Sequence, residues 1–532
     1  MNGPPSNGHG VETAHSSCTI LSDAYDSRPR RLATDQISPI ALESTSSISI
    51  DRPLSLEYTS ESNEYWSTGC AALKPACIIK PASAAEMSTV IKTLSQNNET
   101  FAVKSGGHNP NQNFSSIDGG PLLSTAELNE VTLDKDAMTV RVGPGNRWED
   151  VHKVLDGTNT TVIGGRIGNV GVGGYIVGGG LSFLSGEYGW AANNLVEVEL
   201  VLANGTITTA SASQNADLFR ALKGGGANFG IVTTYTLKAY PIGDIWGGNL
   251  IFTASDETDK ALLAALQNFT QNYPDEKAGI IMTSEITLTN LVHIWILFLF
   301  YDGPSPPAGV FDMFTDLNPG INNAKTRSYY DLLSYNNWAV LKGSAYTIAT
   351  ETTPLLAQNA SAAAVNTTLA HLEDCYAHWV DVSKSHAAVP GLVASLAFQP
   401  YPAIFARKAR EADARVNNGN GAVADLVAFD EAADRIIFEF DYSYLRGLPA
   451  VDRAVDAATV ELYAGMKDVV DAAVAAGRAP DAYRPLFMND GYFRQDYWGR
   501  LSAASRAFAE GVRESVDPRG FWGSRLAGGF FL

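Results

Sequence analysis

The chain has 532 residues, of which 45% are apolar and 18% charged, a composition typical of a soluble globular protein with two or three domains. Its formal net charge of -19 argues against nucleic acid as a partner, because phosphate groups would repel it. No apolar run reaches the roughly 18 residues needed to span a bilayer. The longest run, at 291–301, predicts a buried strand.

The first 50 residues are rich in Ser, Pro, Gly and Thr and predict a poorly ordered N-terminal arm. They lack the basic start and apolar stretch of a signal peptide, which favours a cytoplasmic protein. Seven Asn-x-Ser/Thr sequons keep the secretory pathway open as an alternative. The four cysteines include no Cys-x-x-Cys pair, so no metal site is predicted. Cys70 and Cys77 either close a short disulfide or are buried free thiols.

A β-α-β unit is predicted near the start of the segment 66–240. The apolar stretches 76–81 and 100–106 predict two short strands. The residues between them have helical spacing, and Ser83 is a suitable N-cap for that helix. Strands alternating with helices in this way indicate a sheet covered by helices.

The rest of this half adds more strands and helices of the same kind. A strand is predicted at 138–144, followed by a helix at 147–157 that ends at a glycine. The alternating segment 195–210 predicts a hairpin that turns at Asn204-Gly205. Residues 217–240 predict a short helix, a glycine loop and a final strand. The predicted fold class is therefore α+β.

The segment from about 245 to 480 has fewer glycines and longer elements. Long strands are predicted at 280–301 and 435–445. Pro449 begins a long helical stretch with one apolar face, which ends at Gly477. This pattern predicts a sheet with helices covering one of its faces.

Two glycine-rich segments indicate a ligand held close to the backbone. Gly106-Gly107 ends a strand and is followed by His108. Residues 164–180 contain nine glycines in seventeen positions, interleaved with apolar residues as a flexible linker would not be. A Rossmann fingerprint is excluded because Ile176 stands where its third glycine is required. Two such loops suit a large dinucleotide bound without a Rossmann motif.

Several motifs, in order, resemble those of a known family: "FAVKSGGHNPNQNF", "GPGNRWEDV", "VIGGRIGNVGVGGYIVGGG", "NADLFRALKGGGANFGIVT" and "DPRGFWGSRLAGGF". They are similar to the FAD-linked oxidases of the vanillyl-alcohol-oxidase superfamily, which have a PCMH-type FAD-binding domain, and most similar to the fungal berberine-bridge-enzyme-like branch. The resemblance implies an FAD-binding domain of two α+β subdomains at 51–243 and a substrate domain with an antiparallel sheet at 244–480. A C-terminal segment, 481–532, would return to the FAD-binding domain.

The resemblance also implies how FAD would be held. His108 stands where such enzymes bond a histidine covalently to the flavin 8α-methyl group. Many relatives have a second link through a cysteine, but Ile167 occupies that position, so a single attachment is expected. Val170 matches the small residue that leaves room for O₂ beside the flavin, which favours an oxidase. The further flavin contacts implied are Ser105, Gly106, Gly107, Asn109, Ser124, Gly165, Gly171, Gly174, Ile231 and Asn489.

The catalytic base is less clearly indicated. Many relatives use a tyrosine two residues before the position of Asn489, but Phe487 stands there. Another branch uses a glutamate on a strand, which matches Glu439; alternation predicts it on the same face as Asp441, although such a glutamate is also typical of a solvated face. Other candidates for a catalytic role are Asp490, Tyr492 and Tyr175, the last of which could instead only pack its ring.

These features predict an enzyme, an FAD-dependent oxidase. It would remove a hydride from an alcohol or similar C–H donor of a small secondary-metabolite-type molecule and pass the electrons to O₂ to give H₂O₂. A dehydrogenase with another acceptor, an oxidative cyclase or pericyclase, and a binding protein that has lost its chemistry remain alternatives. The chain is expected to be a monomer or a homodimer.

Overall fold

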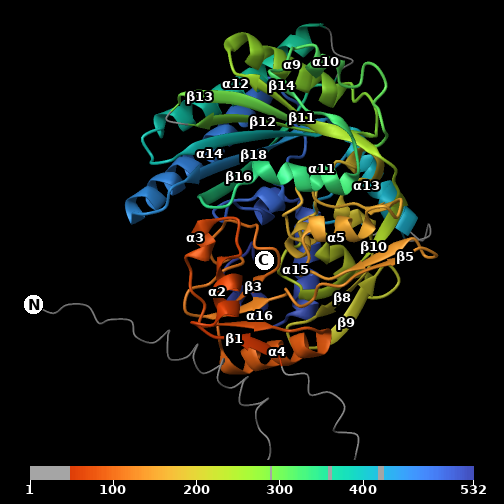
Figure 1. The fold of residues 1–532 in the computed structure, drawn as a ribbon, viewed down its shortest axis with the longest axis vertical. Coiled ribbons are helices and arrows are strands. Elements are labelled where there is room, and N and C mark those ends of the chain that lie inside the picture. The colour runs from red at the N-terminus through yellow and green to blue at the C-terminus, as the bar shows by residue number, and fades with distance from the viewer. Residues whose placement is uncertain (1–47, 288–289, 358–361, 417–423) are drawn as a thin grey trace, which may run out of the picture.

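The computed structural model describes residues 48–287, 290–357, 362–416 and 424–532. The chain forms two lobes, with the C-terminal segment lying beside the first (Figure 1). Of the predicted N-terminal arm, residues 1–47 lie outside the described residues, whereas Ser49 and Ile50 belong to the first strand. Within the described part of the chain, no helix has both the length and the apolar character that a bilayer span requires.

The first sheet has four strands in the order β1-β2-β4-β3. β1 pairs antiparallel with β2, and the other pairs are parallel. The helix α4 (Ala84–Asn97) connects β2 to β3, and the Ser83 hydroxyl accepts a hydrogen bond from the Glu86 amide at 3.2 Å, so the predicted β-α-β unit and its N-cap are confirmed. The strands and small helices are β1 (Ser49–Asp51), α2 (Leu56–Asn63), α3 (Thr68–Ala71), β2 (Cys77–Lys80), β3 (Ala102–Lys104) and β4 (Pro121–Ser124).

The second sheet is antiparallel, in the order β5-β6-β10-β8-β9, with β7 paired to the end of β10. The predicted hairpin is confirmed, since β8 and β9 pair across Asn204-Gly205. The helix predicted at 147–157 is also confirmed and ends before Gly157. The elements are β5 (Val131–Asp134), β6 (Thr139–Val142), α5 (Trp148–Leu155), β7 (Thr160–Val162), α6 (Val172–Val177), α7 (Ser185–Tyr188), β8 (Leu195–Val201), β9 (Ile207–Ser211), α8 (Ala216–Leu222) and β10 (Ile231–Pro241).

The third sheet forms the core of the second lobe. Its strands are antiparallel, in the order β14-β11-β13-β12-β17-β18-β16 with β15 beside β11. The prediction of one long strand at 280–301 is wrong: the segment forms β12 and β13, which pair with each other, and Asn290 between them has a left-handed φ of 68°. The strands are β11 (Ile245–Thr253), β12 (Ala278–Thr287), β13 (Val292–Tyr301), β14 (Ile321–Asn322), β15 (Lys325–Arg327), β16 (Ala345–Pro354), β17 (Val393–Tyr401) and β18 (Arg435–Tyr444).

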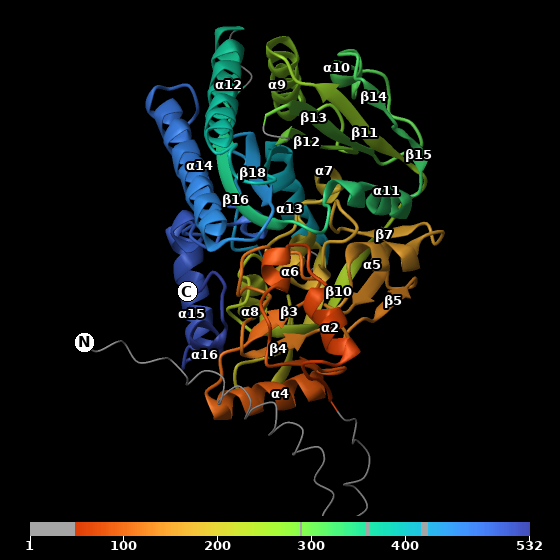
Figure 2. The same cartoon turned by 60° about the vertical axis from the view of Figure 1, so that its left-hand side comes forward.

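Long helices cover the outer face of the third sheet, whereas its inner face is turned toward the first lobe (Figure 2). The predicted one-sided covering is confirmed. α14 begins at Pro449 as predicted and buries an apolar stripe that includes Val455, Leu462 and Met466. The helices of this lobe are α9 (Asp256–Gln271), α10 (Asp312–Thr315), α11 (Tyr329–Asn336), α12 (Ala362–Ser385), α13 (Ala403–Val416) and α14 (Pro449–Ala475).

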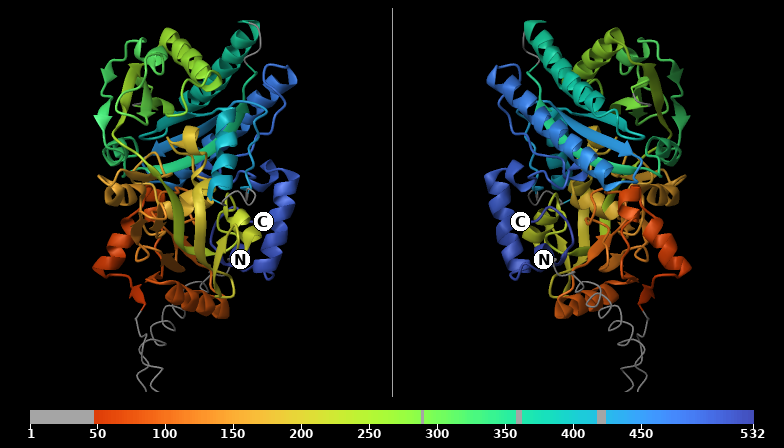
Figure 3. Two further views of the ribbon diagram at one scale, coloured as in Figure 1. Left: turned by 90° about the vertical axis from the view of Figure 1, so that its right-hand side faces the viewer. Right: turned by 90° about the vertical axis from the view of Figure 1, so that its left-hand side faces the viewer.

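The C-terminal segment returns to the first lobe (Figure 3). It contains α15 (Ala503–Val516) and α16 (Phe521–Arg525). The Phe101 amide donates to the Arg525 carbonyl at 2.9 Å, and the aromatic residues of α16 enter the apolar core below the first sheet. The sequence left it undecided whether Cys70 and Cys77 form a disulfide. They are not joined to each other, because Cys70 is a buried free thiol and Cys77 is disulfide-bonded.

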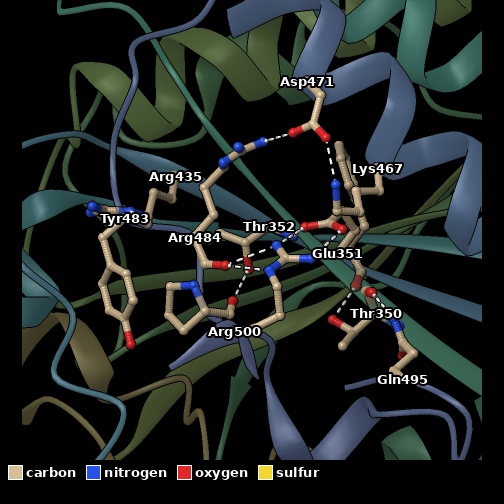
Figure 4. Close-up of polar contacts among 12 residues, drawn as sticks. Thr350, Glu351, Thr352, Arg435, Lys467, Asp471, Tyr483, Arg484, Gln495 and Arg500 are labelled. Carbon is tan, nitrogen blue, oxygen red and sulfur yellow. Dashed lines mark hydrogen bonds and ion pairs between the residues drawn. The ribbon is translucent and has the colours of Figure 1, made fainter. Parts of the chain in front are cut away.

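A buried ion pair joins the third sheet to the C-terminal segment. The Glu351 side chain of β16 is 2% exposed, and the Arg500 guanidinium donates to both of its carboxylate oxygens, at 2.9 and 2.5 Å. Figure 4 shows Arg500 reaching this strand beside Arg484, which contacts Asp471 of α14. A bidentate ion pair of this kind holds the carboxylate and the guanidinium in one relative orientation.

We expect Arg500→Met to lower the free energy of unfolding by about 3–5 kcal/mol, because the Glu351 carboxylate would stay buried without its partner. The matched control is Arg506→Met, since Arg506 pairs with Glu510 on the surface, where both side chains are more than 40% exposed. Its cost should stay below about 1 kcal/mol. Urea unfolding measures both, and equal small losses would contradict the role given to the buried pair.

Candidate active site

A cavity of about 370 Å³ lies between the first lobe and the inner face of the third sheet. One wall consists of the two glycine-rich segments predicted to hold a ligand, and the opposite side consists of residues of β12, β16 and β18. The lining is completed by residues 487–490 and by residues near the C-terminus, within 522–530. The cavity therefore joins parts of the sequence that are far apart.

The two glycine-rich segments touch each other at Gly106 and Gly171. A Cβ atom on Gly106 would lie 2.5 Å from the Gly171 Cα, so neither position tolerates a side chain. Gly107 has a left-handed φ of 68°, which explains why the strand ends in a glycine pair. The Ser105 hydroxyl accepts a hydrogen bond from the Gly173 amide at 3.1 Å. At Gly174 the space for a Cβ is open, and this residue lines the cavity.

Part of the glycine density has a different cause from the one inferred from sequence. Cβ atoms on Gly164 and Gly165 would lie 2.3 and 2.5 Å from the Trp148 ring, and one on Gly178 would lie 2.6 Å from the Asn489 amide. At these positions a larger residue would clash with neighbouring side chains of the protein itself. The need for a close-lying ligand therefore accounts for only some of the nine.

His108 lies at the cavity in a stack of three rings. Its imidazole is parallel to the Trp66 indole, with 4.5 Å between ring centres and 6° between planes. Tyr346 of β16 stacks on the other face of Trp66 at 4.1 Å. Burial, with the nearby charges of Arg147 and Lys342, lowers the pKa of His108 to about 3. The imidazole is therefore neutral at physiological pH.

Three carboxyl groups face the cavity: Glu439, Asp441 and Asp490. Glu439 lies opposite two small residues, Thr350 on one neighbouring strand and Ala397 on the other, so its side chain has room on the inner face of the sheet. Burial, assisted by the charge of Asp441, raises the pKa of Glu439 to about 8. The alternative of a solvated strand face does not apply to this glutamate.

The other two carboxyl groups are perturbed in the same direction. Burial and the charge of Asp490 raise the pKa of Asp441 to about 8. Burial and the charge of Glu439 raise the pKa of Asp490. The three groups therefore hold protons more tightly than ordinary carboxyls, and a hydrogen bond joins Glu439 to Asp441. One oxygen of Asp441, Oδ1, has no partner among the described residues.

Two polar residues that the sequence did not single out complete this cluster. The Arg166 guanidinium donates to the Gln399 side-chain oxygen, and the Gln399 amide donates to Asp490 Oδ2 at 2.8 Å. Gln399 is fully buried on β17. Arg166 is the only charged residue of the segment 164–180, a signal that could have identified it, whereas nothing in the sequence marks Gln399.

The structure brings most of the predicted site residues to this one cavity. Asn489 holds the glycine segment, since its amide donates to the Tyr175 carbonyl at 3.1 Å and accepts from the Gly180 amide at 3.3 Å. Phe487, in place of the expected tyrosine, also lines the cavity. The predicted residues found in the lining are Ser105, Gly106, Gly107, His108, Asn109, Gly165, Val170, Gly171, Gly174, Tyr175, Ile231, Glu439, Asn489 and Asp490.

Two predicted residues lie outside the cavity lining, and the hydroxyl of a third, Tyr175, points to the backbone. Ser124 and Tyr492 do not line the cavity: the Ser124 hydroxyl donates to Glu61 at 2.8 Å, and the Tyr492 hydroxyl donates to Asp456 at 2.6 Å. The Tyr175 hydroxyl lies within 2.9 Å of the Gly164 and Leu181 carbonyl oxygens. Its hydroxyl therefore contacts the backbone, and its ring packs edge-on against the Trp148 indole.

The lining fits FAD. The contact between Gly106 and Gly171 presents backbone without side chains along one wall, as a pyrophosphate requires. Four lining polar atoms have no partner among the described residues and are free to meet a polar ligand: Trp66 Nε1, Ser115 Oγ, Asp441 Oδ1 and Trp522 Nε1. The cavity also extends from this wall to the carboxyl cluster, so one molecule can touch both.

Comparison with known proteins gives a consistent result. A family model described as "FAD binding domain" matches residues 75–211, which include β2 to β9. An uncharacterised FAD-linked oxidoreductase from Arthroderma benhamiae is 40% identical over 491 residues, covering 91% of this chain and 93% of that protein. An FAD-dependent monooxygenase from Fusarium proliferatum is 31% identical over 474 residues, covering 87% of this chain and 86% of that protein.

The fold resembles that of a berberine-bridge-enzyme-like protein from Physcomitrella patens. The two structures align with a TM-score of 0.65 at 16% sequence identity, covering 89% of this chain and 95% of the other. The α+β fold class and the resemblance inferred from the sequence motifs are thereby confirmed.

Proposed function

The chain belongs to the FAD-linked oxidoreductases, and on this premise we propose that it is an oxidase that removes a hydride from a C–H bond of a small alcohol or similar donor and gives H₂O₂. The observation that carries the proposal is the position of Glu439. Its carboxyl group faces the cavity whose opposite wall is formed by the two glycine-rich segments and His108. Bound FAD would supply the hydride acceptor, and a carboxylate in this place can take the substrate proton.

The residues that would hold FAD belong to the first lobe. Ser105, Gly106 and Gly107 would contact the pyrophosphate through their backbone, and the neutral His108 would carry the single covalent link to the flavin ring. Ile167, also in the lining, cannot form a second one. In this proposal residues 51–243 and 481–532 form the FAD-binding domain, and residues 244–480 form the substrate domain.

Glu439 is the proposed base. The cavity lining also includes the apolar Ile281 and Ile348, and burial raises the pKa of the Glu439 carboxyl group. A base with a pKa near the working pH combines adequate ionisation with adequate basicity. Asp441, hydrogen-bonded to Glu439, would share the proton that Glu439 takes up.

The route of the electrons decides between an oxidase and its alternatives. Val170 lines the cavity, which supports the access of O₂.

The test uses a panel of small alcohols and amines. Under anaerobic conditions a substrate should bleach the flavin absorbance, and O₂ should then give one H₂O₂ per product. Oxygen from ¹⁸O₂ in the product would instead indicate a monooxygenase, and no reoxidation by O₂ a dehydrogenase. No bleaching by any substrate that binds would contradict the proposal.

We expect the anaerobic rate of flavin reduction to rise with pH through about 8. Below that value Glu439 is protonated and cannot accept the substrate proton, because burial raises its pKa to about 8. The measurement is stopped-flow reduction between pH 6 and 10. A rate that is flat across this range would contradict the assignment of Glu439 as the base.

A further inference from the structure

The ring stack at His108 connects the two lobes. Trp66 lies between the His108 imidazole, which belongs to the first lobe, and the Tyr346 ring, which belongs to β16 of the third sheet. Its side chain is buried, with 5% of the residue exposed. The imidazole and indole planes differ by only 6°, so the indole covers one face of the imidazole. His108 and Trp66 both line the cavity.

Hydrogen bonds hold the backbone around Trp66 to both lobes. The Trp66 amide donates to the Gly107 carbonyl at 3.1 Å, which ties it to the residue before His108. Next along the chain, the Tyr346 amide donates to the Ser67 hydroxyl at 3.0 Å, and the Thr68 amide donates to the Ser344 carbonyl at 2.9 Å. Figure 1 shows α3, which begins at Thr68, directly below β16.

We propose that Trp66, supported by Tyr346, is a positioning residue that fixes the plane of the His108 imidazole for its attachment to FAD. The inference rests on the covalent link of the proposed function and adds the residue that orients it. Within the described part of the chain no charged group bonds to His108 to orient it, and the cations near it, Arg147 and Lys342, repel its protonated form. A stacked indole restricts rotation of the ring without binding either nitrogen, so a neutral nitrogen stays available.

The attachment itself balances with O₂ as the oxidant. The new bond joins an imidazole nitrogen to the 8α carbon, the methyl group loses one hydrogen, and the imidazole loses its N–H proton. The two electrons of the broken C–H bond pass through the ring system to O₂, which takes up both protons and leaves as H₂O₂. The reaction needs the nitrogen aimed at one carbon atom, and misplacement by about 1 Å can slow such a step about 100-fold.

The test compares Trp66→Leu with Trp66→Phe. Each purified protein is incubated with excess FAD in air, and acid-precipitated samples show how fast the acid-stable flavin rises; total bound FAD is measured in parallel. Trp66→Phe keeps an aromatic face and should retain a rate near that of the wild type. Trp66→Leu should slow attachment about 10- to 100-fold while total bound FAD stays close to the wild-type value. Trp246→Leu is the matched control, because Trp246 stacks on Phe311 and does not line the cavity.

The outcomes separate the two proposals. Acid-stable flavin that forms equally fast in Trp66→Leu and in the wild type would overturn the inference and leave the covalent link intact. Loss of all bound FAD in Trp66→Leu would also overturn it, because Trp66 would then hold the cofactor rather than orient His108. Wild-type protein that never forms acid-stable flavin would overturn the covalent link itself.

Discussion

Replacing Glu439 with Gln should lower kcat/KM about 10²- to 10⁴-fold, the range over which a positioned general base contributes to catalysis. The amide has nearly the same size and shape as the carboxyl group, so it should leave the sheet unchanged. It cannot accept a proton from the substrate. The measurement is steady-state kinetics on a substrate from the panel, together with the anaerobic rate of flavin reduction and the flavin absorbance spectrum.

The matched control for this variant is Glu285→Gln. Glu285 lies on β12 of the same sheet, and burial raises its pKa too, but it does not line the cavity. We expect its kcat/KM to stay within about twofold of the wild type, as for a group outside the reacting site. If Glu439→Gln also kept wild-type activity while Asp490→Asn lost it, the base would be Asp490. Equal losses in Glu439→Gln and Glu285→Gln would indicate a general effect of charge on the sheet.

Replacing His108 with Ala should release all flavin from acid-precipitated protein, whereas the wild-type pellet should stay yellow. The variant lacks the nitrogen that would bond to the flavin, and Ile167 offers no second attachment. FAD should still bind reversibly, because the contact between Gly106 and Gly171 does not depend on the imidazole. Oxidation should be slower, since the covalent link raises the flavin potential.

His386→Ala is the control for the His108 variant. His386 pairs with Glu461 at 3.0 Å near the protein surface, and it does not line the cavity. Its flavin should remain in the acid pellet. Acid-stable flavin in His108→Ala would mean that another residue carries the link. Colourless pellets from both the wild type and His386→Ala would show that FAD is not attached covalently.

Local sequence signals predicted many of the elements because local interactions decide them. α4 begins after Ser83, whose side chain caps it, and α14 begins at Pro449, whose fixed φ suits a first turn. The hairpin at Asn204-Gly205 follows from a turn in which Gly205 takes a positive φ of 77°. The prediction of one strand at 280–301 failed because the apolar pattern of the sequence continues from one strand into the next without a clear turn signal.

The site was predictable only where one segment carries its own signal. The glycine pair before His108 is such a signal. The face of the sheet on which Glu439 lies could not be predicted. Alternation shows which residues share a face, but it does not show whether that face is the inner or the outer one until the neighbouring strands are known. The hydrogen bond between Arg166 and Gln399 joins residues 233 positions apart. The Tyr492 hydroxyl bonds to Asp456, 36 positions earlier, and not to a group of the cavity. Neither contact follows from local sequence.

The most direct test of the account is a crystal structure of the purified protein with its FAD. We expect the isoalloxazine ring in the cavity between the glycine-rich segments and the third sheet, with continuous electron density from the ring to His108 and the Glu439 carboxyl group facing the ring. A flavin ring bound elsewhere, or one separated from Glu439 by other side chains, would contradict the central claim.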